Sequence, residues 1–279
     1  MRTIHARDAR IPALGFGTFR LEGAVARDQV ARALDAGYRH VDTARVYGNE
    51  REVGQGIARS TVPRNQVFLT SKLWPDDFRP EDVARATRAS LAELGTDHVD
   101  LMLLHWPNPE VPVADTLGAL ERARGEGLIR HYGVSNFTVP LFEEAADAAP
   151  RALVTNQVEF HPLLDQRRVR AAARAHGAAV TAYSPLAQGR VAEEPVLREI
   201  AEAHGATPAQ VSLAWILAGP ELVAIPRSSK PERVEENLAA AELALAPSEL
   251  GALDALRDRR ERVIDPEFAP AWDPPGAPA

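Results

Sequence analysis

The chain has 279 residues, of which 45% are hydrophobic and 25% charged, as is typical of a soluble globular protein with a sizeable core. Its net charge of -7 argues against a surface that binds nucleic acid or membranes in general. It contains no cysteine, which excludes disulfides and thiolate chemistry, and no apolar run long enough for a transmembrane helix. The first residues lack the apolar core of a signal peptide, so we expect a cytoplasmic protein.

Apolar stretches that suit strands alternate along the chain with stretches of helical periodicity. Residues 1–12 are expected to form a short hairpin plug. Strands are predicted at 14–19, 40–41, 67–71, 99–104, 131–135, 154–160, 179–183 and 222–225. Helices are predicted at 24–36, 49–59, 80–94, 113–124, 138–148, 165–176, 194–204, 208–218, 231–241 and 247–258. The proline-rich stretch 266–279 is predicted to be an irregular tail.

The repeat of strand, loop and helix, about eight times at intervals of about 30 residues, indicates the fold class. Continuous apolar strands between helices are typical of a parallel sheet that is buried on both faces. Eight units in this length favour a (β/α)8 TIM barrel, with the N-terminal hairpin and a short C-terminal tail, over an open doubly wound sheet. We expect one barrel domain over 1–279. The Rossmann fingerprint is absent, because Gly15-Phe16-Gly17 is followed by Arg20 instead of a third glycine.

Ionisable side chains stand at the ends of three consecutive predicted strands. Asp42 follows the second strand, with Tyr47 on the loop after it, Lys72 follows the third and His105 follows the fourth. Active sites of barrels lie at the C-terminal ends of the strands. The four side chains are therefore expected to face one cavity.

These four residue types can form one acid unit. A phenol has a reference pKa near 10, too high for an efficient acid at pH 7 unless a cation lowers it. Lys72 is the candidate cation, Asp42 can hold Lys72 charged and in place, and we expect the pKa of Tyr47 to be lowered. Tyr47 could then protonate a carbonyl oxygen as a hydride reaches the carbon, while His105 donates a hydrogen bond to that oxygen.

Each of these residues also has an ordinary interpretation when it is taken singly. An aspartate or lysine at a strand end is most often a solvated loop residue or a helix cap, and a tyrosine or histidine there can simply pack. Four residues that form one coherent unit on adjacent strands favour the catalytic interpretation. No metal site is expected, because the eight histidines are scattered without ligand spacing and there is no HExxH motif.

Eight short motifs, in this order and at these spacings, resemble the aldo-keto reductase family over nearly the whole chain. They are Gly15-Phe16-Gly17-Thr18-Phe19, Asp42-Thr43-Ala44 with Tyr47-Gly48-Asn49-Glu50, Ser71-Lys72, Leu104-His105-Trp106-Pro107, Gly133-Val134-Ser135-Asn136-Phe137, Thr155-Asn156-Gln157, Tyr183-Ser184-Pro185-Leu186 and Ile225-Pro226-Arg227-Ser228. The resemblance implies a (β/α)8 barrel, NADPH as hydride donor, and a catalytic tetrad of Asp42, Tyr47, Lys72 and His105 with Tyr47 as the general acid.

The resemblance also implies which residues bind the cofactor. Most of these residues could also have an ordinary structural role, in a turn or as a buried aromatic side chain. Amides and hydroxyls suit the nicotinamide carboxamide, and an aromatic ring suits stacking on the nicotinamide. The matching residues are Ser135, Asn136 and Gln157 at the carboxamide, Tyr183 at the ring, Ser184, Leu186 and Gln188 on a loop over the pyrophosphate, and Thr18 as a further cofactor-binding residue.

The segment 227–237 resembles the family's site for the adenosine 2′-phosphate. Arg227, Lys230 and Arg233 cluster on a loop and a predicted helix N-terminus, where backbone N–H groups and the helix dipole favour a phosphate. A solvated charged turn is the competing interpretation. The family often has lysine at position 227, but arginine keeps the charge, so NADPH preference is expected. The resemblance also assigns Ser228 and Ser229 to the cofactor, and Glu236 and Asn237 to its adenine.

The substrate pocket is expected to be walled by Phe19, Trp74 and Trp106, although ordinary packing would also explain these aromatic residues. The stretches 14–21, 158–164, 262–266 and 269–273 resemble the small bacterial 2,5-diketo-D-gluconate reductases. Members of that branch also reduce methylglyoxal and other small carbonyl compounds, and they are usually monomers. The short tail argues against a deep, steroid-sized pocket.

Two other functions stay open at this point. The barrel could be a non-catalytic, NADPH-sensing partner subunit, although the chain has no long N-terminal extension of the kind those subunits carry. It could also be an aldolase that forms a Schiff base through Lys72. The sequence favours an NADPH-dependent reductase of small aldehydes, α-dicarbonyls or keto-sugars.

Overall fold

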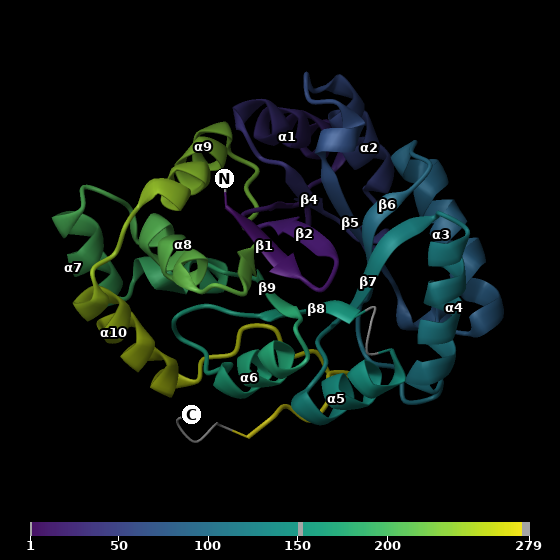
Figure 1. Cartoon of the computed structure of the whole chain (residues 1–279). Coiled ribbons are helices and arrows are strands. Elements are labelled where there is room, and N and C mark those ends of the chain that lie inside the picture. Colours follow the sequence, from purple (N-terminus) through teal and green to yellow (C-terminus); the bar gives the residue numbers. More distant parts are fainter. Residues whose placement is uncertain (1, 150–152, 275–279) are drawn as a thin grey trace.

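The computed structural model describes residues 2–149 and 153–274 of the 279. Parallel strands form a barrel, and a ring of helices surrounds it (Figure 1). The eight strands of the main sheet are hydrogen-bonded in chain order from last to first. They are β3 (Phe16–Gly17), β4 (His40–Asp42), β5 (Phe68–Leu73), β6 (Val99–Leu104), β7 (Ile129–Ser135), β8 (Leu153–Glu159), β9 (Ala179–Tyr183) and β10 (Leu222–Ala224).

The two edge strands of this sheet meet and close the barrel. Leu14 forms a parallel bridge with Ala224. The N–H of Gly15 donates to the carbonyl of Ala224 at 2.8 Å, and the N–H of Ala224 donates to the carbonyl of Ala13 at 2.8 Å. The predicted first strand, 14–19, is therefore only partly confirmed, because its first residues form this seam and only two residues form the ladder to β4.

A two-stranded antiparallel hairpin covers the N-terminal end of the barrel, as predicted. Its strands β1 (Thr3–Ala6) and β2 (Ala9–Pro12) alternate buried and exposed residues. The buried face, which includes Ile4 and Ile11, packs on barrel residues such as Leu101 and Val223. Burying this apolar face closes the barrel bottom, so the opposite, C-terminal end is the one left available for a site.

The helices lie outside the barrel in the predicted order. They are α1 (Gly23–Ala36), α2 (Glu50–Arg59), α3 (Pro80–Leu94), α4 (Val113–Gly125), α5 (Val139–Ala148), α6 (Arg167–Ala175), α7 (Pro195–Ala203), α8 (Pro208–Ala218), α9 (Pro231–Ala239) and α10 (Pro247–Ala255). Proline opens α3 and α9, where its missing N–H costs no helical hydrogen bond. Gly95 ends α3 in a left-handed conformation with φ 64°.

Small differences from the prediction occur at element ends. The helices predicted at 231–241 and 247–258 end earlier and continue as short 3-10 turns, Ala240–Glu242 and Leu256–Arg259. Residues 266–274 are irregular, as predicted, whereas the rest of the predicted tail, 275–279, lies outside the described residues. Among the helices that the structure describes, none is both long and apolar enough to cross a membrane.

Candidate active site

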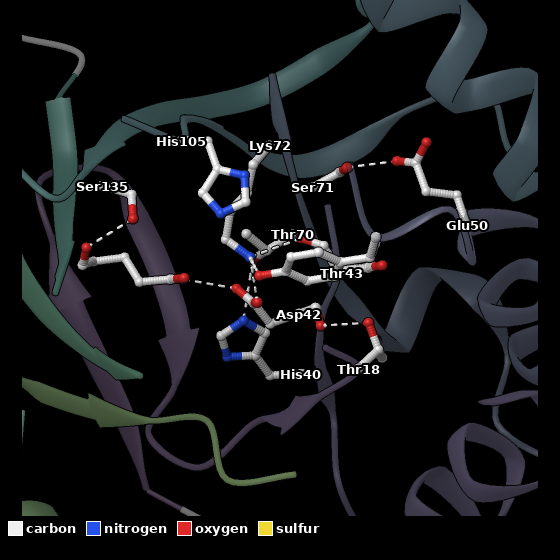
Figure 2. A network of polar contacts seen from close by, with 12 residues as sticks. Thr18, His40, Asp42, Thr43, Glu50, Thr70, Ser71, Lys72, His105 and Ser135 are labelled. Atoms are coloured by element: carbon white, nitrogen blue, oxygen red, sulfur yellow. Dashed lines mark hydrogen bonds and ion pairs between the residues drawn. The ribbon is translucent and has the colours of Figure 1, made fainter. Parts of the chain in front are cut away.

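The strand ends bring the four predicted acid-unit residues together at one end of the barrel. Asp42 is the last residue of β4, and Lys72 lies inside β5, one residue before its end, although the predicted strand stopped at 71. His105 directly follows β6, and Tyr47 ends a 3-10 turn after β4. Neighbouring parallel strands end at the same edge of a sheet, which is why Asp42, Lys72 and His105 lie close together (Figure 2).

The Lys72 ammonium group is the centre of this cluster. Its Nζ donates to Oδ1 of Asp42 at 2.5 Å, to the carbonyl of Thr43 at 2.8 Å and to the hydroxyl of Tyr47 at 3.3 Å. Lys72 is fully buried and Asp42 almost so. Three acceptors therefore use the three donors of the ammonium group, which satisfies a buried charge that would otherwise be costly.

Burial and the neighbouring charges act in opposite directions on these groups. Burial lowers the pKa of Lys72, but the Asp42 carboxylate and Tyr47 outweigh it, so the net shift is upward and Lys72 stays charged. Burial raises the pKa of Tyr47, and Lys72 opposes that rise only in part. The expected lowering of the Tyr47 pKa is therefore wrong in sign for the protein alone, because removal of the phenol from water outweighs the attraction of the cation. Part of the ring remains accessible, yet the protein packed around it desolvates the hydroxyl.

His105 completes the cluster as a neutral imidazole. Burial, followed by repulsion from Lys72, holds its pKa well below the ordinary value. Its ring lies edge-on to that of Tyr47, with 5.6 Å between centroids. Among the described residues, neither ring nitrogen has a hydrogen-bond partner, and Nδ1 is buried. A neutral imidazole can still donate from one nitrogen, so His105 has a donor that no described group uses.

A second polar group, on β7, β8 and β9, is hydrogen-bonded to the first. Gln157 donates from Nε2 to Oδ2 of Asp42 at 2.7 Å, and Ser135 donates from its hydroxyl to the carbonyl of Gln157 at 2.8 Å. Asn136 donates to the carbonyl of His105 at 3.0 Å and accepts from the hydroxyl of Tyr183 at 2.7 Å. These four residues, assigned from the sequence to the nicotinamide, thus lie beside the acid unit.

The remaining predicted cofactor residues lie in three places: beside Asp42, on the loop after β9, and at the start of α9. Thr18 is buried beside Asp42, to whose carbonyl its hydroxyl donates at 3.1 Å. Ser184 and Gln188 lie on the loop after β9 and have positive φ values of 45° and 54°; Leu186 lies between them. Non-glycine residues rarely adopt this backbone region, and such conformations cluster at functional sites.

The predicted phosphate segment lies at the N-terminus of α9. The N–H of Gly17 donates to the carbonyl of Pro226 at 2.9 Å, which joins this segment to the strand that precedes Thr18. Arg227, Lys230 and Arg233 are exposed, and none of them forms an ion pair with a described acidic residue. Three unpaired cations at a helix N-terminus are a suitable site for an anion.

Hydrogen bonds and burial fix several of the other residues assigned to the adenosine part of the cofactor. Ser228 is buried and accepts from the N–H of Lys230 at 3.0 Å, whereas Ser229 is exposed. Glu236 accepts from the hydroxyl of Thr207 at 2.8 Å, and Asn237 is buried. Ser228 is thus fixed within the segment itself, and Glu236 is fixed by a contact to the residue before α8.

The sequence model of the aldo/keto reductase family matches residues 13–258, which include every strand of the barrel sheet. The chain belongs to this family. The eight motifs identified from the sequence lie within the matched region, so the predicted resemblance is confirmed.

Individual relatives of this aldo/keto reductase agree with the predicted branch. It is 45% identical over 267 residues to "Methylglyoxal reductase DkgB" of Escherichia coli O157:H7, covering 94% of this chain and 99% of that protein. It is 41% identical over 261 residues to an aldo-keto reductase of Mycolicibacterium vanbaalenii, covering 93% of each. A crystal structure described as that of "a putative 2,5-diketo-D-gluconic acid reductase B" superposes with a TM-score of 0.94 at 44% identity, covering 97% of this chain and 98% of that one.

A row of aromatic rings borders the acid unit of this aldo/keto reductase. Phe19 lies 5.0 Å from Tyr47, and Trp74 lies 5.3 Å from His105, between ring centroids. Trp106, the residue after His105, is buried. Phe19 and Trp74 therefore lie beside the phenol and the imidazole, while the assignment of all three aromatic residues to a substrate pocket stays a prediction.

One residue of this aromatic row was missed from the sequence. Phe268, in the irregular tail, lies edge-on to both Trp74 and Trp106, with centroid distances of 5.8 and 5.2 Å, and it is 58% exposed. The only signal in the sequence was an isolated aromatic residue in a proline-rich tail, and this signal is weak because single exposed apolar residues are common on protein surfaces.

In the described ranges 2–149 and 153–274, no group of three or more histidine, cysteine, aspartate or glutamate side chains could hold a metal ion.

Proposed function

We propose that this protein is an NADPH-dependent reductase of small aldehydes, α-dicarbonyls or keto-sugars, with Tyr47 as the general acid. The single observation that carries the proposal is the chain of contacts from Asp42 through the Lys72 ammonium to the Tyr47 hydroxyl at the strand ends. A buried, charged lysine held against a phenol stabilises the phenolate that remains once the proton has left.

The residues present fit a nicotinamide cofactor. The amide and hydroxyl groups of Ser135, Asn136 and Gln157 lie beside Asp42 and His105, where a carboxamide would find both donors and acceptors. Tyr183 offers a ring on the next strand, and its hydroxyl is already anchored on Asn136. NADPH, when bound, supplies the hydride that is delivered to the carbonyl carbon.

The protein's own residues handle the proton. Tyr47 is protonated at neutral pH, since its pKa is raised above a reference value that is already near 10, and a general acid needs its proton before the reaction. As negative charge develops on the carbonyl oxygen, the O–H bond of Tyr47 breaks, the proton passes to that oxygen, and Lys72 stabilises the phenolate. His105, neutral and with an unused donor, orients the carbonyl oxygen without competing for the proton.

Preference for NADPH over NADH rests on the N-terminus of α9. Arg227, Lys230 and Arg233 place three exposed cations there, without carboxylate partners among the described residues. A 2′-phosphate would gain charge-assisted hydrogen bonds from these side chains, whereas the 2′-hydroxyl of NADH would gain little from them.

Small carbonyl substrates suit the site best. Relatives that match the chain end to end carry names that refer to methylglyoxal and to 2,5-diketo-D-gluconate. Phe19 and Trp74 lie against the rings of Tyr47 and His105, and Phe268 extends this apolar surface to Trp106. Such a surface favours a compact substrate whose polar atoms meet Tyr47 and His105.

The two alternatives are less well supported. An amine that forms a Schiff base must lose its proton, yet all three donors of Lys72 are engaged and its pKa is raised. A non-catalytic partner subunit has no need of a complete acid unit, although only activity can decide against it.

The test is loss of absorbance at 340 nm when the protein is mixed with NADPH and methylglyoxal, repeated with NADH and with 2,5-diketo-D-gluconate. Faster oxidation of NADPH supports both the reductase and the phosphate site. Oxidation of NADH alone would contradict the assignment of Arg227 and Arg233. Tight NADPH binding without turnover of any carbonyl would favour the partner subunit.

A further inference from the structure

Glu159 is a fully buried carboxylate that the proposed mechanism does not use. It is the last residue of β8, two positions after Gln157, and its side chain has no exposed surface. Its Oε1 accepts from the N–H of Val263 at 2.7 Å and from Nε2 of His161 at 2.9 Å. Its Oε2 accepts from the N–H of Ile264 at 2.9 Å and lies 3.8 Å from the Arg262 guanidinium.

Three of these four groups belong to the C-terminal tail. The tail, yellow in Figure 1, has left the last helix before it reaches Glu159, and it then runs past α6 and α5. Two consecutive backbone N–H groups on one carboxylate form a strong, charge-assisted anchor. A buried charge this well satisfied is costly to rearrange, so the backbone at 263–264 is held in one position.

Two further contacts hold the tail on either side of this anchor. Before it, the N–H of Glu261 donates to the carbonyl of Leu163 at 2.8 Å. After it, the Asp273 carboxylate accepts from the N–H of Val139 at 2.9 Å, at the first residue of α5. Trp272 stacks on Arg262 at 3.7 Å, which ties the far end of the segment back to the anchor. Residues 261–273 thus form a strap fixed at both ends.

Phe268 lies in the middle of this strap and meets the substrate pocket. Three residues lie between it and Ile264, and four lie between it and Asp273. The strap has no helix or strand of its own, but two hydrogen bonds within it shape a loop around Phe268. The N–H of Ala269 donates to the carbonyl of Pro266 at 2.8 Å, and Trp272 donates from Nε1 to Asp265 at 2.8 Å. Both bonds join one part of the strap to another, so neither fixes the loop to the barrel. Its position depends on the anchors.

We propose that Glu159 is a positioning residue for substrate recognition, because it clasps the backbone of 263–264 and so holds Phe268 in the aromatic wall of the pocket. The expected effect on substrate binding rests on the proposed carbonyl reductase activity. The clasp, by which we mean the hydrogen bonds from the N–H groups of residues 263 and 264 to the Glu159 carboxylate, does not depend on that activity. The Glu159 side chain forms no hydrogen bond or ion pair with the acid unit or with the residues assigned to the cofactor. Its charge helps to raise the pKa of Tyr183, the neighbouring residue on β9, but the tyrosine ring is held by its hydrogen bond to Asn136. Its loss should therefore alter substrate binding and leave the chemical step and NADPH binding unchanged.

Three variants distinguish the loss of the clasp from the loss of the Phe268 ring at the substrate site. Glu159→Gln keeps the size of the side chain, but its amide group presents donors where one tail N–H needs an acceptor. Ile264→Pro removes the N–H that Oε2 accepts and leaves Glu159 itself intact, which covers a failure of the first variant to fold. Phe268→Ala removes the ring and keeps the clasp. Glu261→Gln is the control, because that carboxylate lies in the same strap but pairs only at the surface with Arg190 and Arg259.

Amide hydrogen exchange of the cofactor-free protein measures the clasp directly. We expect exchange across 262–268 to become at least about tenfold faster in Glu159→Gln and Ile264→Pro, and to stay unchanged in Phe268→Ala and Glu261→Gln. Unchanged exchange in both anchor variants would overturn the clasp.

Steady-state kinetics with NADPH and 4-nitrobenzaldehyde measure how far the clasp affects binding of the aldehyde. We expect the KM for the aldehyde to rise about three- to tenfold in Glu159→Gln, Ile264→Pro and Phe268→Ala, with kcat and the Kd for NADPH within about twofold of the unaltered protein. The double variant Glu159→Gln/Phe268→Ala should bind the aldehyde no worse than Glu159→Gln.

The outcomes also separate this inference from the proposed function. Faster exchange with an unchanged KM would overturn the positioning role, and so would an unchanged KM in Phe268→Ala. A fall in kcat or in NADPH affinity of the same size as the rise in KM would mean that Glu159 supports the whole barrel mouth. An unaltered protein that reduces no carbonyl would contradict the proposed function, while the exchange experiment would still decide the clasp.

Discussion

Gln157 donates a hydrogen bond from its Nε2 to Oδ2 of Asp42 at 2.7 Å, so the residue assigned to the nicotinamide also supports the acid unit. Asp42 uses its other oxygen, Oδ1, for Lys72. The Asp42 carboxylate is thus held between the Gln157 amide and the Lys72 ammonium group, and all three side chains belong to one buried network.

Gln157→Met should destabilise the protein as well as weaken cofactor binding. It leaves Oδ2 of Asp42 buried without its donor, which we expect to lower the free energy of unfolding by about 1–3 kcal/mol in urea titrations. Gln29→Met is the matched control: Gln29 is buried on α1 and its Oε1 has no partner among the described residues. Equal losses in the two variants would mean that the bond to Asp42 contributes nothing.

Tyr47→Phe should abolish the proton transfer and keep the fold. We expect kcat for methylglyoxal to fall by about 10²- to 10⁴-fold, because only the hydroxyl is removed, with the Kd for NADPH unchanged in fluorescence titrations. Tyr132→Phe serves as the control, since that hydroxyl donates to Glu121 on α4 at 2.9 Å, away from the acid unit. A Tyr47→Phe enzyme with an unaltered rate would rule out Tyr47 as the acid.

Arg233→Ala should weaken the binding of NADPH and leave that of NADH unchanged. Loss of one charge-assisted contact to the 2′-phosphate corresponds to an increase of about 10- to 100-fold in the KM for NADPH. Arg88→Ala, which removes an exposed arginine of α3 that pairs with Glu126, should change neither constant. If Arg233→Ala raised both constants equally, the segment would not discriminate between the cofactors.

Stability should fall below pH 6.5 partly because of His105. Its pKa is depressed in the folded protein, so below pH 6.5 the unfolded chain binds a proton that the folded protein does not, and the stability present at higher pH is lost. When the pH falls from 7.0 to 5.5, the free energy of unfolding should decrease in the unaltered protein by up to about 1.4 kcal/mol more than it does in His105→Gln. His40 is also buried with a lowered pKa, but it is present in both proteins and cancels in the difference. Parallel pH profiles would contradict the depressed pKa.

The barrel and most of the site could be predicted because they depend on short, local patterns. Apolar strands alternate with amphipathic helices, and parallel strands end at one edge, so Asp42, Lys72 and His105 had to lie close together. Element ends were less well predicted: β3 is shortened because Leu14 pairs across the seam with Ala224, more than 200 positions away.

The amino-acid sequence by itself determined the fold class, the acid unit at the strand ends and the basic segment at the start of α9, since each follows from residue type and spacing. Only the tertiary structure decided that burial outweighs Lys72 and raises the pKa of Tyr47, and that Gln157 supports Asp42. It also decided that Glu159 and Phe268 connect the tail to the pocket. These features depend on burial and on contacts between distant segments, which become defined only when the barrel has closed and the tail has packed against it.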